Sequence, residues 1–551
     1  MVEKNIDTAI QNLVLKFNNR DYQLVIDESL KLVDQNFKIP IIFNLLGASY
    51  FSIKNPNKAL TYYFRAIDID PNNDEILRNI AKCYMFQKKY NMAEEYLIKS
   101  LGIKKDNSDA LFNIGLIKIL LNEYNKAIDF LNQALIIQPK FTECIYNLGL
   151  CYKNLGDYKT AIKYYSKSIK TNPNHLKSYN NLGVCFFLIN DYQNAINTLK
   201  YCLNLKSNYS SAFSNLGSVY LALKNFKKAK YFFSEAYALN KNLINAGIQK
   251  IYLERRICDW SSDHEIFNLM EDSIALDVDV IPWQCLAMED NPSNHLKRAK
   301  NFSRQFQLKS DNLNIYNNSK IRIGYFAIDF HKHPGMVNMF GIFKNHNKEK
   351  FEIVGFYYGN IKKDEMHNEI KNYFDEFYYV DELSDEEIAN LAKEVKIDIA
   401  INRSGHTDNA RGNIFSFKPA PIQITYLGYP GTLGQEGIDY IISDKFVTPK
   451  KYITHYSEKI IYLTDCFYPK DNSRNISNKI FNRSDLGVDK DSFVFCTLNN
   501  SYKITKEEFT IWMNVLNGVN KSFLVLLSNS KEMEENLKAE ALNHNVDLKY
   551  L

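Results

Sequence analysis

The sequence has little of what marks several common protein classes. Its 551 residues include only 13 prolines and 21 glycines, which excludes collagen-like and low-complexity chains. The 9 cysteines are odd in number and scattered, with no CxxC pair, so neither a disulfide framework nor a zinc site is expected. The formal net charge is only +5, which argues against a polybasic nucleic-acid binder.

Long apolar runs and several well-known motifs are also missing. No stretch of 18 apolar residues occurs, and the N-terminal sequence MVEKNIDTAIQN lacks the apolar core of a signal peptide. GxGxxG, P-loop and nucleophile-elbow motifs are not found either. These observations favour a cytoplasmic protein with reduced cysteines and no membrane partner.

Aromatic residues are abundant, with 37 Tyr and 35 Phe against 3 Trp, and many of them recur at a fixed interval. A small residue returns every 34 positions, at Gly47, Ala81, Gly115, Gly149, Gly183 and Gly217. An alanine follows each of them by twelve residues, at Ala59, Ala93, Ala127, Ala161, Ala195 and Ala229. Prolines occupy a further repeated position, at Pro71, Pro139 and Pro173.

This register resembles the tetratricopeptide repeat, a helix–turn–helix unit in which small residues allow two helices to approach closely. It predicts an α-solenoid over residues 1–245, with six clear repeats from about residue 40 to 242 and a degenerate N-terminal repeat at 5–35. The repeated Tyr and Phe then fill the gaps between repeats. They therefore indicate packing, and we expect no nucleic-acid partner.

An asparagine stands two residues before the small residue in five of the repeats, at Asn79, Asn113, Asn147, Asn181 and Asn215. A carboxamide offers two donors and one acceptor, so a column of them could hold the backbone of an extended polypeptide without reading its sequence. The alternative is that each asparagine caps or bridges neighbouring helices. The strict register favours peptide binding.

The second half of the chain follows a strand–helix alternation. Residues 246–318 form a connector, with a polar loop at 309–320. The predicted strands lie at 321–328, 351–359, 397–402, 421–429 and 438–443, and helical patterns cover 366–377 and 386–395. Such alternation predicts a mostly parallel, doubly wound sheet, which we place in a Rossmann-like lobe at 319–480.

The alternation restarts in a second lobe at 481–551. Strands are predicted at 493–498 and 522–528, each followed by a helix, and residues 547–551 look like the opening of a third strand. Two and a half strands cannot enclose a core, so we expect this lobe to be incomplete as given. The sequence leaves open whether the chain is a fragment or the product of an interrupted reading frame.

Four segments carry a resemblance: DFHKHP (329–334), SGHTDNARGNIFSFKPAPIQITYLGYPGT (404–432), YSEKIIYL (456–463) and CTLNNSYKI (496–504). Together with the repeats they resemble the protein O-GlcNAc transferase/SPINDLY family. The resemblance implies tetratricopeptide repeats joined to a two-lobed GT-B glycosyltransferase that binds a nucleotide-sugar between its lobes. Family members continue beyond the position of Leu551 with further strands and nucleotide-binding residues.

The resemblance also implies roles for individual residues. His333 matches the family's active-site histidine and would assist the acceptor hydroxyl, whereas His331 is the weaker candidate. Lys503 matches the lysine that neutralises the donor's diphosphate. The remaining residues expected to bind the donor are His406, Thr407, Gly428, Pro430, Gly431, Thr432 and Asn500, the last in a position where the family usually has glutamine.

The implied function is transfer of a sugar to Ser or Thr of a polypeptide, with inversion at the anomeric carbon. UDP-N-acetylglucosamine is the preferred donor, and GDP-fucose, as in the SPINDLY branch, is the alternative. We expect neither a cofactor nor a metal, because the acidic pair of the segment DVD (277–279) lies in the connector and follows no strand. The chain as given is expected to be inactive alone. A peptide-binding scaffold without catalysis is the competing hypothesis.

Overall fold

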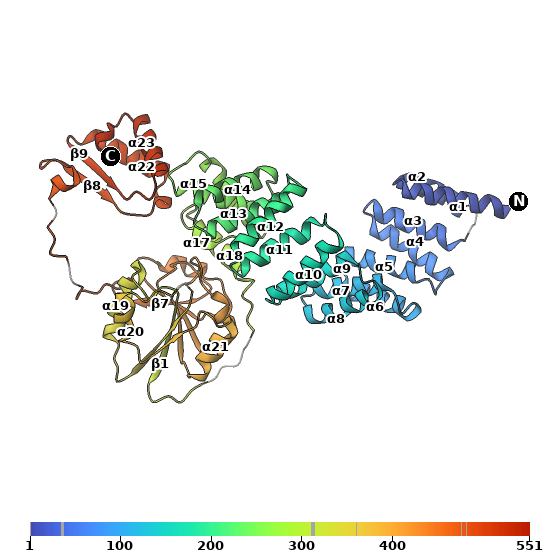
Figure 1. Ribbon diagram of the computed structural model, residues 1–551, viewed down its shortest axis with the longest axis horizontal. Coiled ribbons are helices and arrows are strands. Elements are labelled where there is room, and N and C mark those ends of the chain that lie inside the picture. The colour runs from blue at the N-terminus through green and yellow to red at the C-terminus, as the bar shows by residue number, and fades with distance from the viewer. Residues whose placement is uncertain are drawn as a thin grey trace. The chain divides into compact units, whose positions relative to one another are not determined.

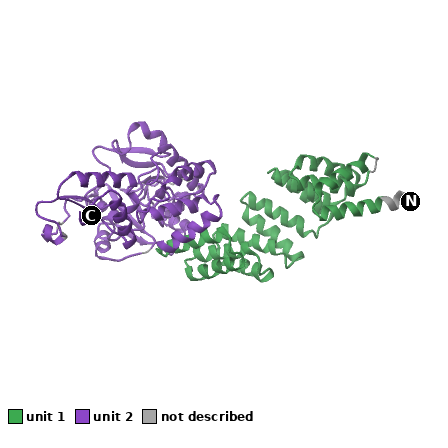
Figure 2. Ribbon diagram, turned by 90° about the horizontal axis from the view of Figure 1, so that it is seen from above, with its two compact units in different colours: residues 1–225 green, residues 226–551 purple. Residues whose placement is uncertain are grey.

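The computed structural model describes residues 2–34, 38–309, 315–359, 361–474, 477–480 and 482–550. The chain divides into two compact units, Met1–Asn225 and Phe226–Leu551 (Figure 2). Part of the loop expected at 309–320 falls on residues 310–314, which lie outside the described residues.

Unit 1 consists of consecutive helical hairpins (Figure 1). Its helices are α1 (Val2–Asn18), α2 (Tyr22–Asp34), α3 (Pro40–Ser52), α4 (Pro56–Ile69), α5 (Asp74–Phe86), α6 (Tyr90–Ile103), α7 (Ser108–Leu120), α8 (Tyr124–Ile137), α9 (Thr142–Asn154), α10 (Tyr158–Thr171), α11 (Leu176–Leu188), α12 (Tyr192–Leu205) and α13 (Ser210–Ala222). Polar side chains start several of them: Asn73 caps α5, and Asp157 caps α10. The predicted solenoid is confirmed.

A residue with left-handed backbone conformation separates the two helices of each hairpin. These residues recur every 34 positions, at Arg20, Lys54, Lys88, Asn122, Gly156, Asn190 and Lys224. A left-handed residue ends a helix and turns the chain, so it fixes where the second helix begins. Because Arg20 keeps the register, the helix pair α1–α2 is a repeat in phase with the others.

The repeated glycines allow a large side chain of the paired helix to reach the first helix. A Cβ atom at Gly149 would lie 2.8 Å from the ring of Tyr165, and one at Gly183 would lie 2.6 Å from Leu199. Tyr165 and Leu199 are themselves fully buried. The period of the sequence therefore reflects a contact repeated in each hairpin.

Unit 2 begins with helices: α14 (Phe226–Leu239), α15 (Ile244–Arg255), α16 (Ile266–Ala275), α17 (Pro282–Cys285) and α18 (Pro292–Ser303). The described residues that follow form a seven-stranded parallel sheet in the order β3-β2-β1-β4-β5-β6-β7. Its strands are β1 (Ile321–Ala327), β2 (Phe351–Tyr357), β3 (Glu376–Tyr379), β4 (Ile399–Asn402), β5 (Ile422–Thr425), β6 (Tyr440–Asp444) and β7 (Lys459–Leu463).

Helices cover both faces of this sheet (Figure 1). On one face, α19 (Pro334–Asn345) and α20 (Glu365–Lys371) pack on β1 and β2 through Met339, Phe343 and Ile370. On the other face, α21 (Asp385–Glu394) packs through Ile388 and Ala392 against Phe326 and Val354. The doubly wound α/β fold is thereby confirmed.

The second lobe contains the parallel strands β8 (Phe493–Thr497) and β9 (Ser522–Leu526), with α22 (Lys506–Gly518) and α23 (Lys531–Asn543). Its core extends into the connector, because Trp260 and Cys258 are buried with Phe509 and Met513. The Trp260 indole N–H donates to the Ile504 carbonyl at 3.0 Å, and Asn536 Nδ2 donates to the Ile257 carbonyl at 2.8 Å. Connector and second lobe are thus packed together.

Two expectations about secondary structure were wrong. The pattern at 366–377 predicts one helix, but α20 ends at Lys371 and residues 376–379 form β3, which pairs with β2. Apolar spacing through Phe374 and Phe377 continues the helical pattern, yet pairing with β2 decides the conformation. Near the end of the chain, Leu548–Tyr550 form a 3₁₀ turn in place of the predicted third strand, and Leu551 lies outside the described residues.

Candidate functional site

The strand order reverses between β1 and β4. The chain moves from β1 outward to β2 and β3, and then returns to place β4 on the other side of β1. Ligands of open α/β sheets bind beyond the carboxyl ends of the strands at such a point. The loops after β1, β4 and β5 carry most of the residues predicted from the sequence: His333, His406, Thr407, Gly428, Pro430, Gly431 and Thr432.

His333 lies at the end of the loop after β1 and is the N-cap residue of α19. About half of its side chain is exposed, at 47%, so the ring is open to a substrate. Its Nδ1 lies 2.8 Å from Oδ2 of Asp329, and the same oxygen lies 3.0 Å from Nη2 of Arg403. The structure therefore joins the loops after β1 and β4 through a buried carboxylate.

The loop that carries His333 is fastened by several hydrogen bonds. Asp364 accepts from the Lys332 backbone N–H at 2.9 Å. The buried His367 approaches the Phe330 carbonyl through Nδ1 at 2.8 Å. His331, the weaker candidate, contacts the Tyr357 hydroxyl through Nδ1 at 2.8 Å, and burial lowers the pKa of its ring. His331 thus points toward the end of β2 and contributes to holding the loop.

Asp329 and Arg403 were not identified as site residues from the sequence. Their side chains are only 5% and 6% exposed, so both ions are buried and paired. Each follows a predicted strand closely, which is the signal that could have found them. What the sequence did not contain is the pairing itself, because it depends on β1 and β4 being neighbours.

Several polar atoms at this edge of the sheet have no hydrogen-bond partner. Within the described part of the chain, three such buried side-chain atoms belong to residues at the ends of β1 and β4: Asp329 Oδ1, Asn402 Nδ2 and Arg403 Nε. Buried polar groups without partners are rare in proteins and mark places where a ligand can be bound. This edge of the sheet therefore has buried polar atoms next to the Asp329–His333 pair.

His406 and Thr407 are held by their surroundings. Nε2 of His406 lies 2.7 Å from the Leu433 carbonyl, and burial lowers the pKa of this ring to about 4. A neutral ring that donates from Nε2 keeps only Nδ1 as an acceptor. Thr407 donates from its hydroxyl to the Ser404 carbonyl at 2.7 Å. Their predicted contact with the donor stays a prediction.

The segment Gly428–Thr432 follows β5 and closes against Arg403. The Gly428 N–H donates to the Arg403 carbonyl at 3.0 Å, and a side chain at Gly428 would collide with that carbonyl. Thr432 donates to the buried carboxylate of Glu458 at 2.7 Å. Pro430 is exposed, and Gly431 lies against the ring of Tyr429. Glycine is therefore needed here for a close backbone approach.

Asn500 and Lys503 lie in the turn between β8 and α22, and both side chains are exposed. Lys503 is the last residue of the short 3₁₀ helix Ser501–Lys503. Burial raises the pKa of the neighbouring Tyr502, and Asn500 and Arg256 oppose this. Burial also raises the pKa of Asp408, while Arg256 opposes this.

The asparagine column is partly used within unit 1. Three of its members donate to a side chain of the preceding repeat: Asn79 to Asn44 at 3.1 Å, Asn181 to the Tyr146 hydroxyl at 2.9 Å, and Asn215 to Asn180 at 2.8 Å. Asn113 and Asn147 donate to carbonyls of their own helices at 2.8 Å. The bridging role is thus present at three positions, and peptide binding by the column stays a prediction.

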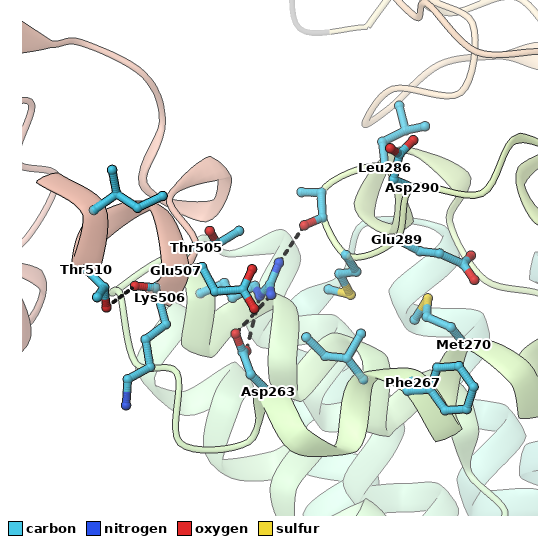
Figure 3. Close-up of a pocket in the computed structure, with 15 residues that line it drawn as sticks. Asp263, Phe267, Met270, Leu286, Glu289, Asp290, Thr505, Lys506, Glu507 and Thr510 are labelled. Carbon is cyan, nitrogen blue, oxygen red and sulfur yellow. Dashed lines mark hydrogen bonds and ion pairs between the residues drawn. The ribbon is translucent and has the colours of Figure 1, made fainter.

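A cavity of about 940 Å³ lies elsewhere in unit 2, between the connector and the start of α22 (Figure 3). Phe267, Met270 and Leu286 line its connector side, and Glu507 and Thr510 lie on the side of α22. None of the predicted site residues lines this cavity. We place the candidate site at the sheet edge because a paired histidine and polar atoms without partners occur there.

Among the residues that the structure describes, no group of three or more His, Cys, Asp or Glu side chains is placed to hold a metal ion. Within the same described ranges, no helix combines the length and the apolar character that crossing a bilayer requires.

Comparison with known proteins identifies both halves of the chain. The model of glycosyl transferase family 41 matches residues 299–480 and 473–551. Tetratricopeptide repeat models match residues 40–73, 75–107, 108–141, 142–175, 176–209 and 210–243. A solved structure of a mutant O-GlcNAc transferase from Thermobaculum terrenum is 18% identical, with 74% of this chain and 72% of that chain covered and a TM-score of 0.46.

The curated relatives carry related names. The "Probable UDP-N-acetylglucosamine–peptide N-acetylglucosaminyltransferase SEC" of Arabidopsis thaliana is 37% identical over 213 residues, which are 38% of this chain and 22% of that protein. The UDP-N-acetylglucosamine–peptide N-acetylglucosaminyltransferase of Caenorhabditis elegans is 27% identical, over 39% of this chain and 20% of that protein. SPINDLY of Arabidopsis thaliana is 28% identical, over 37% and 22%.

The chain thus spans about a fifth of the length of each of these relatives. The repeats, the parallel sheet and the family match together cover most of the described residues. The chain therefore joins tetratricopeptide repeats over residues 40–243 to a region, residues 299–551, that matches glycosyl transferase family 41, and its relatives carry the names of O-GlcNAc transferases and of SPINDLY.

Proposed function

We propose that the protein transfers a sugar from a nucleotide-sugar to a Ser or Thr hydroxyl of a polypeptide. The observation that carries this proposal is the position of His333: a half-exposed ring, paired with a buried carboxylate, at the switch point of a sheet in a glycosyltransferase-family chain. A ring so placed can take a proton from a hydroxyl that approaches the donor.

In the proposed reaction the acceptor oxygen forms a bond to the anomeric carbon while the bond to the diphosphate breaks. The bonding electrons leave with the nucleotide diphosphate, and the acceptor's proton passes to Nε2 of His333. Attack from the face opposite the leaving group inverts the anomeric centre. Lys503 supplies positive charge to the departing diphosphate, so no metal ion is required in this scheme.

UDP-N-acetylglucosamine is the donor we favour. The relative named SEC is 37% identical, whereas SPINDLY of the same plant is 28% identical over a similar length. The segment LGYPGT after β5 also resembles the O-GlcNAc branch more closely. GDP-fucose remains the alternative donor, because Gly405-His406-Thr407 is shared with the SPINDLY branch.

The acceptor is an extended polypeptide held by the solenoid. Asn113 is partly exposed and uses one amide hydrogen within its own helix, which leaves the carbonyl oxygen and a second hydrogen for a peptide backbone. The column would hold many sequences, since backbone groups are common to all of them.

The test supplies the full-length protein with labelled UDP-N-acetylglucosamine or GDP-fucose and a Ser/Thr-containing peptide, and detects the modified peptide by mass spectrometry. We expect modification with the first donor and its loss, by about 10²-fold or more, in His333→Ala and Lys503→Ala. Lys531→Ala is the control, since this lysine is 87% exposed in the same lobe. Chelation of divalent cations is expected to leave the rate unchanged.

Binding is measured separately by thermal shift with UDP and with GDP. A shift with UDP that Lys503→Ala abolishes supports the proposed site. No shift with either nucleotide and no modified peptide would favour the competing function, a peptide-binding scaffold.

A further inference from the structure

Asp329 is a buried carboxylate with two cationic or polar neighbours, His333 and Arg403. Its Oδ2 is shared by Nδ1 of His333 at 2.8 Å and Nη2 of Arg403 at 3.0 Å. Its Oδ1 is buried without a hydrogen-bond partner. The Asp329 side chain is therefore oriented by its contacts with His333 and Arg403.

The protonation of this group of residues follows from their chemistry. Arg403 is always protonated in proteins, and its guanidinium group pairs with the Asp329 carboxylate. A carboxylate only accepts hydrogen bonds, so the close contact with Oδ2 favours the Nδ1–H form of His333. The lone pair of the neutral ring is then on Nε2, the nitrogen on the opposite side from Asp329.

A second neighbour of Nδ1 would favour the other tautomer. The Gly335 backbone N–H points at Nδ1 from 3.3 Å, and a bond from this donor requires the lone pair to be on Nδ1. The carboxylate is closer and charged, and hydrogen bonds to charged partners are about twice as strong as neutral ones. Asp329 therefore decides between two tautomers that compete at one nitrogen.

Arg403 is built into its position. A side chain at Gly335 would collide with its guanidinium group, and one at Gly428 would collide with its backbone carbonyl and approach Nη1 to 3.0 Å. The start of α19 and the loop after β5 thus leave space for this arginine.

We propose that Asp329, paired with Arg403, is the positioning residue of His333: it fixes the Nδ1–H tautomer and turns Nε2 toward the acceptor hydroxyl. This inference rests on the proposed sugar transfer for its use, but not for its test. In the transfer step the acceptor's proton goes to Nε2, and Asp329 takes no proton. It stabilises the imidazolium that forms.

The tautomer of His333 is read by nitrogen-15 NMR on the labelled chain, without donor or acceptor, and His333→Gln assigns the signals. The wild-type ring is expected to be protonated on Nδ1. In Asp329→Leu/Arg403→Met, which replaces both charges by apolar groups of similar shape, Gly335 N–H is the remaining partner, so the proton is expected on Nε2.

The outcome that overturns the proposal is an unchanged tautomer in the double variant, because Asp329 would then serve only to neutralise Arg403. The ring signals decide this whether or not the chain transfers sugar. Where transfer is observed, the double variant is expected to lower kcat by about 10- to 100-fold, with KM for the donor within about twofold of wild type. A rise in KM of about 10- to 100-fold with an unchanged kcat would also contradict a positioning role.

Discussion

The repeat solenoid and the carboxyl edge of the seven-stranded sheet both use glycine to admit a large side chain, but the side chains differ. Gly149 admits the ring of Tyr165, and this contact is repeated with other residues along unit 1. Gly335 and Gly428 admit Arg403, once, in unit 2. In the first region close approach produces apolar packing. In the second it brings a charge to a buried carboxylate.

The difference teaches which features of a chain indicate function. Inter-repeat contacts recur with the period of the sequence. Polar side chains in them form hydrogen bonds with the neighbouring repeat, as Asn181 does with the Tyr146 hydroxyl. At the sheet edge, polar atoms of Asp329, Asn402 and Arg403 are buried and left without partners. Stability in unit 1 therefore depends on repeated contacts, whereas the sheet edge contains the buried Asp329–Arg403 ion pair.

The contrast between the two regions depends on the Asp329–Arg403 pair being buried, unlike an ordinary surface ion pair. Because both side chains are buried, Arg403→Met leaves a carboxylate without compensation and is expected to destabilise unit 2 by about 3–5 kcal/mol. All three tryptophans, Trp260, Trp283 and Trp512, lie in unit 2, so fluorescence during urea unfolding reports this unit.

The control for this experiment is the double variant Asp329→Leu/Arg403→Met, which removes both charges and is expected to recover most of the lost stability. A single variant no less stable than the double would show that the pair is not buried as described.

The sequence predicted the repeats well because their contacts are local. Each hairpin joins residues less than one repeat apart, so the 34-residue period carries the packing directly. The site was predicted only in part. His333 was found through its motif, but its partners were not, since Asp329 and Arg403 meet only when β4 is laid beside β1. The same non-local pairing explains why β3 was mistaken for the end of a helix.

His406 gives the sheet edge a dependence on pH that the solenoid is not expected to share. Burial lowers the pKa of this ring from 6.5 to about 4. The unfolded chain therefore binds a proton that the folded chain refuses as the pH falls below about 6.5. We expect unit 2 to lose about 3 kcal/mol of stability between pH 6.5 and 4, with no further loss from this group at lower pH.

Tryptophan fluorescence at a series of pH values measures this loss. His406→Gln keeps a donor for the Leu433 carbonyl but cannot titrate, so the difference between wild type and variant isolates the ring. Parallel stability curves for the two proteins would contradict a buried neutral histidine.

Glycine packing in the solenoid can be tested with a matched pair. A Cβ at Gly149 would meet the buried ring of Tyr165 at 2.8 Å, so Gly149→Ala is expected to cost about 1–3 kcal/mol. Gly102 lies near the end of α6 with nothing within 4 Å of an added Cβ, and Gly102→Ala is expected to be neutral or to stabilise by up to about 1 kcal/mol. Far-ultraviolet circular dichroism follows the helices during unfolding. Equal effects at both positions would mean that the repeated glycine does not serve close approach.

The asparagine column gives the smallest effects and separates its two roles. Asn181 bridges to Tyr146, so Asn181→Ala is expected to cost about 1 kcal/mol of solenoid stability. Asn113 bonds only a carbonyl of its own helix, and alanine is the better helix former, so Asn113→Ala is expected to be neutral or slightly stabilising. If the column holds a peptide backbone, both variants weaken peptide binding, measured by fluorescence anisotropy, although only one weakens the fold. If the column only bridges repeats, affinity follows stability and Asn113→Ala binds as the wild type does. Asn113, which contributes less than Asn181 to the stability of the solenoid, is therefore the residue whose substitution tests peptide binding most directly.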